Sequence, residues 1–149
     1  MAEETDGGGT APPRRVLETA LYAEDLEAAR AFYGGVIGLA AVHFAPERNA
    51  FFRCGEGMLL VFDPRATETE PVAVGGGTIP LHGARGPGHV AFAANDDEMA
   101  AWRARFARHG VPVESEIDWP GGGHSIYVRD PAGNSVEIAS PRLWKLAPA

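Results

Sequence analysis

The spacing of apolar residues changes twice along the first half of the chain. A loosely alternating run over residues 16–23 predicts a strand. Asp25 is a suitable N-cap, and Leu26, Ala29, Phe32 and Tyr33 follow at helical spacing, so we expect a helix that ends at the glycines Gly34, Gly35 and Gly38. Short apolar runs separated by turn residues then predict three strands, at residues 39–44, 50–54 and 58–62.

The second half of the chain repeats this order. Residues 63–87 are rich in Gly and Pro and predict a linker. A strand is expected at residues 89–94, and a helix capped by Asp96 or Asp97 runs to about His109. Three further strands are predicted at residues 111–117, 125–129 and 135–139.

The two halves also align residue by residue. Glu18 matches His89 at an offset of 71, whereas Arg53, Gly57 and Val61 match Arg129, Gly133 and Glu137 at an offset of 76. One such module cannot cover its own sheet. We therefore predict an α+β fold in which two βαβββ modules form a curled mixed sheet around an open cleft, with the helices outside. The boundaries are a disordered tail at 1–13 and one domain at 14–149, with modules at about 16–62 and 88–140 joined by the linker 63–87.

Composition narrows the class of protein. The 149 residues carry a formal net charge of −7 and no stripe of basic and aromatic residues, which argues against nucleic acid as a partner. No apolar run approaches the length of a membrane span, and the acidic, Gly-rich start does not resemble a signal peptide, so we expect a cytoplasmic protein. Cys54 is the sole cysteine, which excludes an internal disulfide.

Strand alternation places three chemically useful side chains on one surface. Because large apolar residues should face the helices, Glu18, His89 and Glu137 should point into the cleft from three strands. One imidazole and two carboxylates suit a divalent cation such as Zn, Ni, Co, Mn or Fe(II). Glu137 lies between Val136 and Ile138, so it needs a partner, which could be a metal, an Arg or water.

Three segments resemble a known superfamily. Residues 127–139 (YVRDPAGNSVEIA) look like the closing turn and ligand-bearing strand of the vicinal oxygen chelate superfamily, which includes glyoxalase I, bleomycin-resistance proteins and extradiol dioxygenases. Residues 25–39 (DLEAARAFYGGVIGL) look like its first helix, and residues 88–92 (GHVAF) like the opening of its second module. The resemblance covers about residues 16–140.

The resemblance implies metal ligands at Glu18, Val61, His89 and Glu137, of which Val61 cannot bind a metal. The chain thus departs from the four-ligand pattern of glyoxalase I and approaches the three-ligand pattern of fosfomycin-modifying enzymes and extradiol dioxygenases, which usually have His where Glu18 stands. His82, in a Gly/Pro-rich loop, could fold over the cleft as a second imidazole or a general base. The catalytic candidates are Glu18 and His82.

Each assignment has a structural alternative. His89 could be a hydrogen-bonded cleft histidine, Glu137 the partner of an Arg, and Glu18 a catalytic base or a structural acid. Aromatic residues in strands are often plain core. The candidate substrate-binding residues are Tyr22, Phe51, Trp119, His124 and Tyr127.

Three functions are compatible with these observations. The first is a metal-dependent glyoxalase-like enzyme that acts on a small substrate with adjacent oxygens, as a lyase, isomerase or epimerase. The second is a metal-free protein of the bleomycin-resistance type that binds a drug or metabolite, and the third is extradiol cleavage of a catechol. By resemblance we expect a homodimer. The sequence leaves open the substrate, the metal, and whether one chain or two close the cleft.

Overall fold

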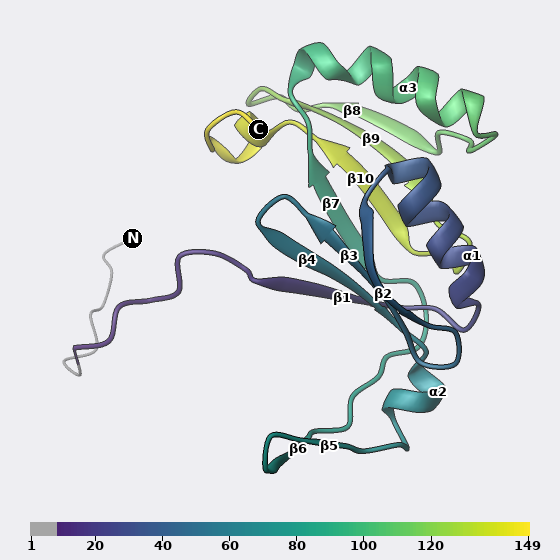
Figure 1. Cartoon of the computed structure of the whole chain (residues 1–149). Helices are drawn as coiled ribbons and strands as arrows, with labels where there is room; N and C mark the ends of the chain where they lie inside the picture. The colour runs from purple at the N-terminus through teal and green to yellow at the C-terminus, as the bar shows by residue number, and fades with distance from the viewer. Residues whose placement is uncertain (1–8) are drawn as a thin grey trace.

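The computed structural model describes residues 9–149 (Figure 1). In its first module, strand β1 (Glu18–Tyr22) leads into helix α1 (Leu26–Arg30), which continues as a π-helical segment, η1 (Ala31–Ile37). Strands β2 (Ala40–Ala45), β3 (Asn49–Cys54) and β4 (Gly57–Phe62) complete it, in the sheet order β1-β4-β3-β2. β1 runs parallel to β4, and the other pairs are antiparallel.

The second module repeats this topology. Strand β7 (His89–Ala93) is followed by the short η2 (Asp96–Glu98) and helix α3 (Met99–Arg108). Strands β8 (Ser115–Asp118), β9 (His124–Arg129) and β10 (Ser135–Ala139) give the order β7-β10-β9-β8, with β7 parallel to β10. The predicted α+β fold of two βαβββ modules is confirmed. A short helical turn, η3 (Pro141–Trp144), follows β10.

The linker between the modules is more ordered than its composition indicates. It contains helix α2 (Pro64–Thr67) and a hairpin of β5 (Val72–Val74) and β6 (Gly77–Ile79), which forms a separate two-stranded sheet. Pro64 stands at the first position of α2, where its missing N–H costs nothing, and Asp63 caps the helix. The predicted disorder of residues 1–8 lies outside the described residues, and residues 9–17 have no helix or strand.

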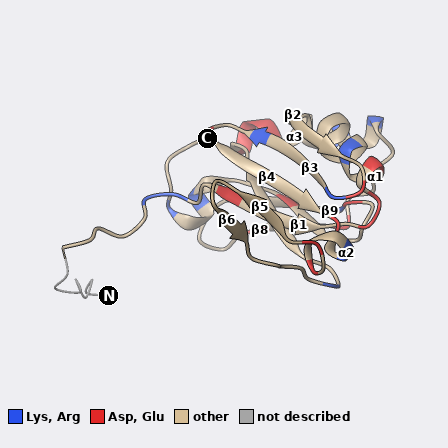
Figure 2. Cartoon of the chain, turned by 60° about the horizontal axis from the view of Figure 1, so that its bottom comes forward, with Lys and Arg blue, Asp and Glu red and all other residues tan. Residues whose placement is uncertain are grey.

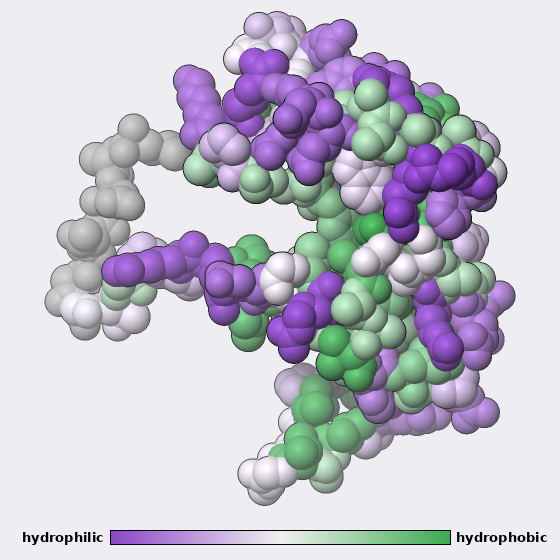
Figure 3. Space-filling view, turned by 45° about the horizontal axis from the view of Figure 1, so that its top comes forward, coloured by the Kyte–Doolittle hydropathy of each residue, from purple (hydrophilic) through white to green (hydrophobic). Residues whose placement is uncertain are grey.

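Helix-facing side chains of both modules share one apolar core. In the first module Leu21, Phe52 and Val61 contribute to it, and in the second Phe106 and Ile138 do. The alternation that buries these residues turns the intervening ones to the other face of each sheet. The molecule is deeply hollowed on the side away from α1 (Figure 3).

A buried polar network joins the two modules within this core. The Tyr33 hydroxyl donates to Asp130 Oδ2 at 2.6 Å, and Asn134 binds Asp130, the Gly88 amide and the Tyr22 carbonyl. Burial, together with the negative charge of Asp130, raises the pKa of Tyr33, so its hydroxyl stays protonated and remains a donor. The end of β1 is thereby fixed against the start of β7.

Replacing Tyr33 with Phe tests this link. The change leaves the ring in place but removes one donor from a buried carboxylate, so we expect the free energy of unfolding to fall by about 1–3 kcal/mol. Urea denaturation followed by circular dichroism measures this. A loss below about 0.5 kcal/mol would show that the hydrogen bond does not hold the modules together.

Several predicted boundaries are shifted. The first helix runs through Gly34 and Gly35 to Ile37, and Gly38, the last of the three predicted glycines, is its C-cap with φ of 90°. Asn95, and not Asp96 or Asp97, is the N-cap of the second helical segment. Arg105 of α3 donates to the carbonyls of Gly35 and Val36, which satisfies acceptors at this end of the helix. The strand predicted at 111–117 begins only at Ser115.

Candidate functional site

A pocket of about 400 Å³ lies on the face of the second sheet that points away from α3. His89 of β7, Tyr127 of β9 and Glu137 of β10 line it. Trp119, in the turn before β9, and Trp144, at the end of η3, also line it. The structure thus brings together four of the residues that the sequence analysis singled out, His89, Glu137, Trp119 and Tyr127.

Glu137 is nearly buried, and its two carboxylate oxygens have different partners. Oε2 accepts a hydrogen bond from the Ser125 hydroxyl at 2.6 Å, and Ser125 in turn accepts one from the Trp119 indole N–H at 2.8 Å. Oε1 lies 3.2 Å from His89 Nε2. The buried carboxylate of Glu137 therefore has two partners, Ser125 and His89. Among the described residues, no Arg pairs with Glu137.

The contact at His89 Nδ1 indicates which ring nitrogen carries the proton in the neutral imidazole. Its Nδ1 lies 3.0 Å from the Ser135 carbonyl oxygen, which can only accept, so Nδ1 carries a proton. A neutral imidazole then has its lone pair on Nε2, and this atom lies beside the carboxylate of Glu137. Two acceptors in contact repel each other. A cation held by both groups would remove this repulsion.

Tyr127 completes this end of the pocket. Its ring stacks beside His89, with centroids 6.4 Å apart and an interplanar angle of 24°. Burial raises the pKa of Tyr127, and the nearby charge of Glu137 raises it further. The Tyr127 hydroxyl thus remains a hydrogen-bond donor at neutral pH.

Glu18 does not join His89 and Glu137 within one chain. No group of three His, Cys, Asp or Glu residues that could hold a metal ion occurs in residues 9–149. The end of β1 at Tyr22 contacts the second module through Asn134, but Glu18 stands at the opposite end of that strand, about 13 Å away for an extended chain. The alternation of the sequence correctly assigned Glu18 to the inner face of its sheet, but Glu18 does not lie beside His89 and Glu137.

His82 and two predicted substrate-binding aromatics form a separate cluster on the first module. The Tyr22 hydroxyl lies 2.7 Å from His82 Nδ1, and the His82 ring meets Phe62 edge-on at 4.7 Å. Phe51 packs against Phe62. Burial, followed by the charge of Glu68, raises the pKa of Tyr22. The pocket around His89 includes neither His82, Tyr22 nor Phe51 among its lining residues.

The strand register corrects the predicted match of Val61 with Glu137. Glu18 pairs with Met58 and His89 with Ser135, so Leu60, not Val61, is the first-module counterpart of Glu137. Val61 is fully buried in the core. Leu60 cannot bind a metal either, so the absence of a fourth ligand persists.

His124 lies on the other face of β9 from the pocket, contrary to its predicted role in substrate binding. Ser125 and Tyr127 face the pocket, whereas His124 points toward α3, where Arg103 lies 3.1 Å from its Nε2. The hydrogen bond to Asp118, 2.7 Å from Nδ1, raises the pKa of His124, and Glu116 adds to this. Partial burial of the imidazole, which disfavours its charged form, limits the rise.

This pKa shift predicts a pH dependence of stability. A histidine with a raised folded-state pKa stabilises the fold at pH values below its unfolded value of about 6.5, and this contribution disappears as the pH rises through the folded pKa. Urea unfolding from pH 5.5 to about 8.5 should show a decline that His124→Gln lacks. Parallel curves for the two proteins would contradict the assignment.

Sequence reasoning missed Ser125, which holds the Glu137 carboxylate, and Trp144, which lines the pocket. Ser125 could have been found, because it is two residues before Tyr127 and so shares its face of β9. Trp144 depends on η3 folding back over β10, for which the strand pattern carries no signal.

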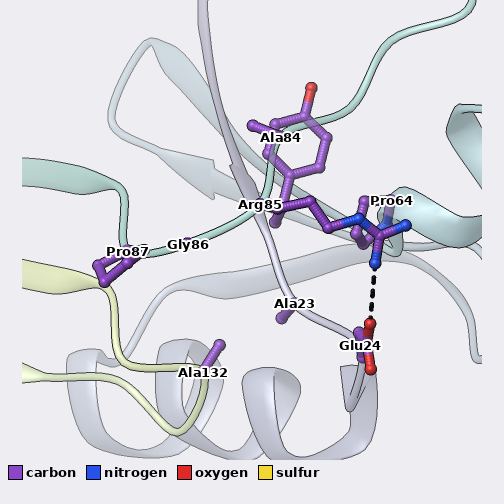
Figure 4. A pocket seen from close by; sticks show the side chains of 9 residues that line it. Ala23, Glu24, Pro64, Ala84, Arg85, Gly86, Pro87 and Ala132 are labelled. Atoms are coloured by element: carbon purple, nitrogen blue, oxygen red, sulfur yellow. Dashed lines mark hydrogen bonds and ion pairs between the residues drawn. The ribbon is translucent and has the colours of Figure 1, made fainter.

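A second pocket lies where the linker crosses the end of β1 (Figure 4). Arg85 reaches across it to Glu24 at 3.1 Å and to Glu68 at 2.7 Å. Both ion pairs are largely exposed, and basic and acidic positions are interspersed over the chain (Figure 2). We interpret this pocket as the seam where the linker is held against the first module.

The family of the chain follows from comparison with known proteins. Residues 15–138 match the model of the Glyoxalase/Bleomycin resistance protein/Dioxygenase superfamily. The chain belongs to this superfamily. Comparison with the curated proteins gives no significant match. No helix of residues 9–149 is long and apolar enough to cross a bilayer.

Solved structures of the superfamily fold resemble the chain over most of its length. A lactoylglutathione lyase from Agrobacterium tumefaciens is 47% identical, with a TM-score of 0.83, and the match covers 91% of this chain and 100% of that one. A superfamily protein from Nocardioides is 23% identical with a TM-score of 0.66, covering 89% of this chain and 86% of the other. The fosfomycin resistance protein FosX from Mesorhizobium loti is 21% identical with a TM-score of 0.58, covering 88% and 94%. The last two similarities concern the fold alone.

Proposed function

We propose that the protein is a metal-dependent, glyoxalase-like lyase, isomerase or epimerase that acts on a small substrate with two adjacent oxygens. The observation that carries the proposal is the contact between His89 Nε2 and Glu137 Oε1, in which both atoms present lone pairs when the imidazole is neutral. A divalent cation resolves that conflict, and imidazole plus carboxylate suit Zn, Ni, Co, Mn or Fe(II). The 47% identity to a lactoylglutathione lyase supports the same class of reaction.

The residues around the two ligands fit such a site. Ser135 fixes the His89 tautomer through its carbonyl, and Ser125 orients the Glu137 carboxylate, as supporting hydrogen bonds commonly do at metal centres. A cation bound there would hold two adjacent substrate oxygens and stabilise the negative charge that develops on them when a neighbouring C–H loses its proton. Tyr127 is a neutral donor at the same end of the pocket.

We further propose that the site is completed between two copies of the chain. His89 is 52% exposed at its side chain, and the inner residues of β7, Ala91 and Ala93, are exposed too. Two ligands on an open face leave a site incomplete. Glu18, exposed on the first module, would supply a second carboxylate from a partner, either as the third ligand or as the group that moves the proton. His82, beside Tyr22, is the alternative proton carrier.

Proton exchange with solvent tests the proposed reaction. The metal-loaded protein is incubated in D₂O with a panel of α-hydroxyketones and the hemithioacetal of methylglyoxal and glutathione. Loss of the C–H signal next to the carbonyl is followed by NMR. We expect exchange or product with at least one compound and none with His89→Ala. A metal-bound protein that exchanges none of them would contradict the proposal.

A metal-free binding protein is the second candidate. It is favoured by Leu60, which stands where a fourth ligand would be expected and cannot bind a metal. Tight binding of an unmodified compound, unaffected by chelators, would favour this function.

A further inference from the structure

Two tryptophans with accessible faces flank the pocket that contains His89 and Glu137. Trp119 is 37% exposed and Trp144 is 75% exposed, and both line the same cavity. Large aromatic faces are costly to leave in water, and those that line a cavity commonly contact a ligand. The polar groups of the cavity, by contrast, gather at the sheet, where His89, Glu137 and Tyr127 lie.

Trp119 is fixed before any ligand binds. Its indole N–H donates to the buried Ser125 hydroxyl at 2.8 Å, and its backbone N–H and carbonyl both bond within the turn, to Gly123 and Gly122. The ring therefore cannot rotate without breaking a buried hydrogen bond. A wall held in this way binds a flat group with little loss of conformational entropy.

The glycine turn also determines where Trp144 lies. Gly123 has φ of 102°, and a Cβ there would come within 2.8 Å of the Leu143 side chain and 3.0 Å of Ser140 Oγ. Only glycine allows η3 to pack this closely, which places Trp144 over the same cavity as Trp119.

The charges near the pocket disfavour an anionic ligand arm. No Lys or Arg is among the lining residues in the described part of the chain. Arg142 lies beside the glycine turn, but it is paired with Asp96. Arg129, on the same face of β9 as Tyr127, is held by Glu114 at 2.6 Å. Within the described residues of one chain, an arm with free carboxylates would thus face Glu137 with no uncommitted cation nearby.

We infer that this pocket takes a small substrate whose adjacent oxygens lie at His89 and Glu137 and whose other end is an uncharged planar aromatic group that packs on Trp119 and Trp144. This inference rests on the proposed function, because His89 and Glu137 hold the cation that binds the oxygens. It predicts that a glutathione conjugate, whose peptide arm carries free carboxylates, binds this pocket less well than an aromatic substrate does.

Calorimetric titration of the metal-loaded protein tests the inference with matched probes. Benzohydroxamate and acetohydroxamate both present adjacent oxygens and differ in the aromatic ring, and glutathione serves as the anionic probe. We expect benzohydroxamate to bind about tenfold more tightly than acetohydroxamate. In Trp144→Ala the preference should fall to about threefold or less while acetohydroxamate binding is unchanged. Leu146→Ala, an exposed change outside the pocket, is the control and should keep the wild-type ratio.

The outcomes distinguish a failure of this inference from a failure of the proposed function on which it rests. Hydroxamates that bind equally well, and that still require His89 and metal, would overturn the aromatic arm and leave the proposed function standing. A ratio unchanged in Trp144→Ala, or glutathione binding more tightly than benzohydroxamate, would overturn it as well. If neither hydroxamate shows metal-dependent binding, the inference and the proposed metal site both fail.

Discussion

Glu137→Gln is expected to weaken the binding of divalent metal at least about 100-fold, because loss of a supporting residue alone costs 10–100-fold and this change removes a ligand charge. The amide is nearly isosteric and can still accept from Ser125, so the fold should persist. Isothermal titration with Zn²⁺ and Co²⁺ measures the affinity, and circular dichroism checks the fold. Glu114→Gln is the matched control, since Glu114 is an exposed carboxylate paired with Arg129.

An unchanged affinity in Glu137→Gln would contradict the proposed ligand set. A loss of the same size in Glu114→Gln would also contradict it, because it would show that general surface charge rather than a specific carboxylate attracts the cation.

Mixing two inactive variants should restore activity if the site forms between chains. Glu18→Gln damages the first module, and Glu137→Gln damages the second. In a two-fold dimer built from both, one composite site carries both changes and the other carries neither. Random exchange of subunits makes about half of the dimers mixed, so activity should recover to about a quarter of the wild-type value.

The same experiment has a clear opposite result. If one chain closes the cleft by itself, every site carries one of the two changes and mixing restores nothing. Size-exclusion chromatography with light scattering establishes that the variants are dimers and exchange subunits. Glu18→Gln paired with Glu114→Gln is a useful control, because its mixed dimers contain one intact and one Glu18-deficient site whichever way the cleft closes.

Most of the fold could be predicted from apolar periodicity, since long alternating and helical patterns reflect which face is buried. The boundary errors have causes that the neighbouring sequence does not reveal. Gly34 and Gly35 are typical helix breakers, yet η1 runs through them because Arg105, distant in sequence, satisfies carbonyls at its end. The β5–β6 hairpin has three-residue strands, too short to give a recognisable pattern.

The register error shows why the site was harder to predict than the fold. Arg53 pairs with Met58, whereas Arg129 pairs with Ser135, so the turn before β10 is one residue longer than the turn before β4. A one-residue slip moves a side chain to the opposite face of the sheet. Matching by offset therefore chose Val61, a core residue, in place of Leu60.

The sequence pattern predicts the face of a strand on which a side chain lies, but it does not predict the distance between side chains on different half-sheets. Alternation correctly places Glu137 and Tyr127 on one face, because they are direct neighbours in the sheet. It equally assigns Glu18 to an inner face, but no local pattern gives the angle at which two half-sheets diverge. His124 was assigned to the pocket from its position after a glycine turn, although its parity with Ile126 places it on the α3 face.

Elemental analysis of the untagged protein, beside His89→Ala and Glu137→Gln, is the most direct test of the claim that His89 and Glu137 hold a divalent cation. After incubation with divalent metals and removal of the excess, we predict about one equivalent per wild-type chain and almost none in either variant. Wild-type protein that retains no metal under any of these conditions would contradict the claim and favour the metal-free binding protein.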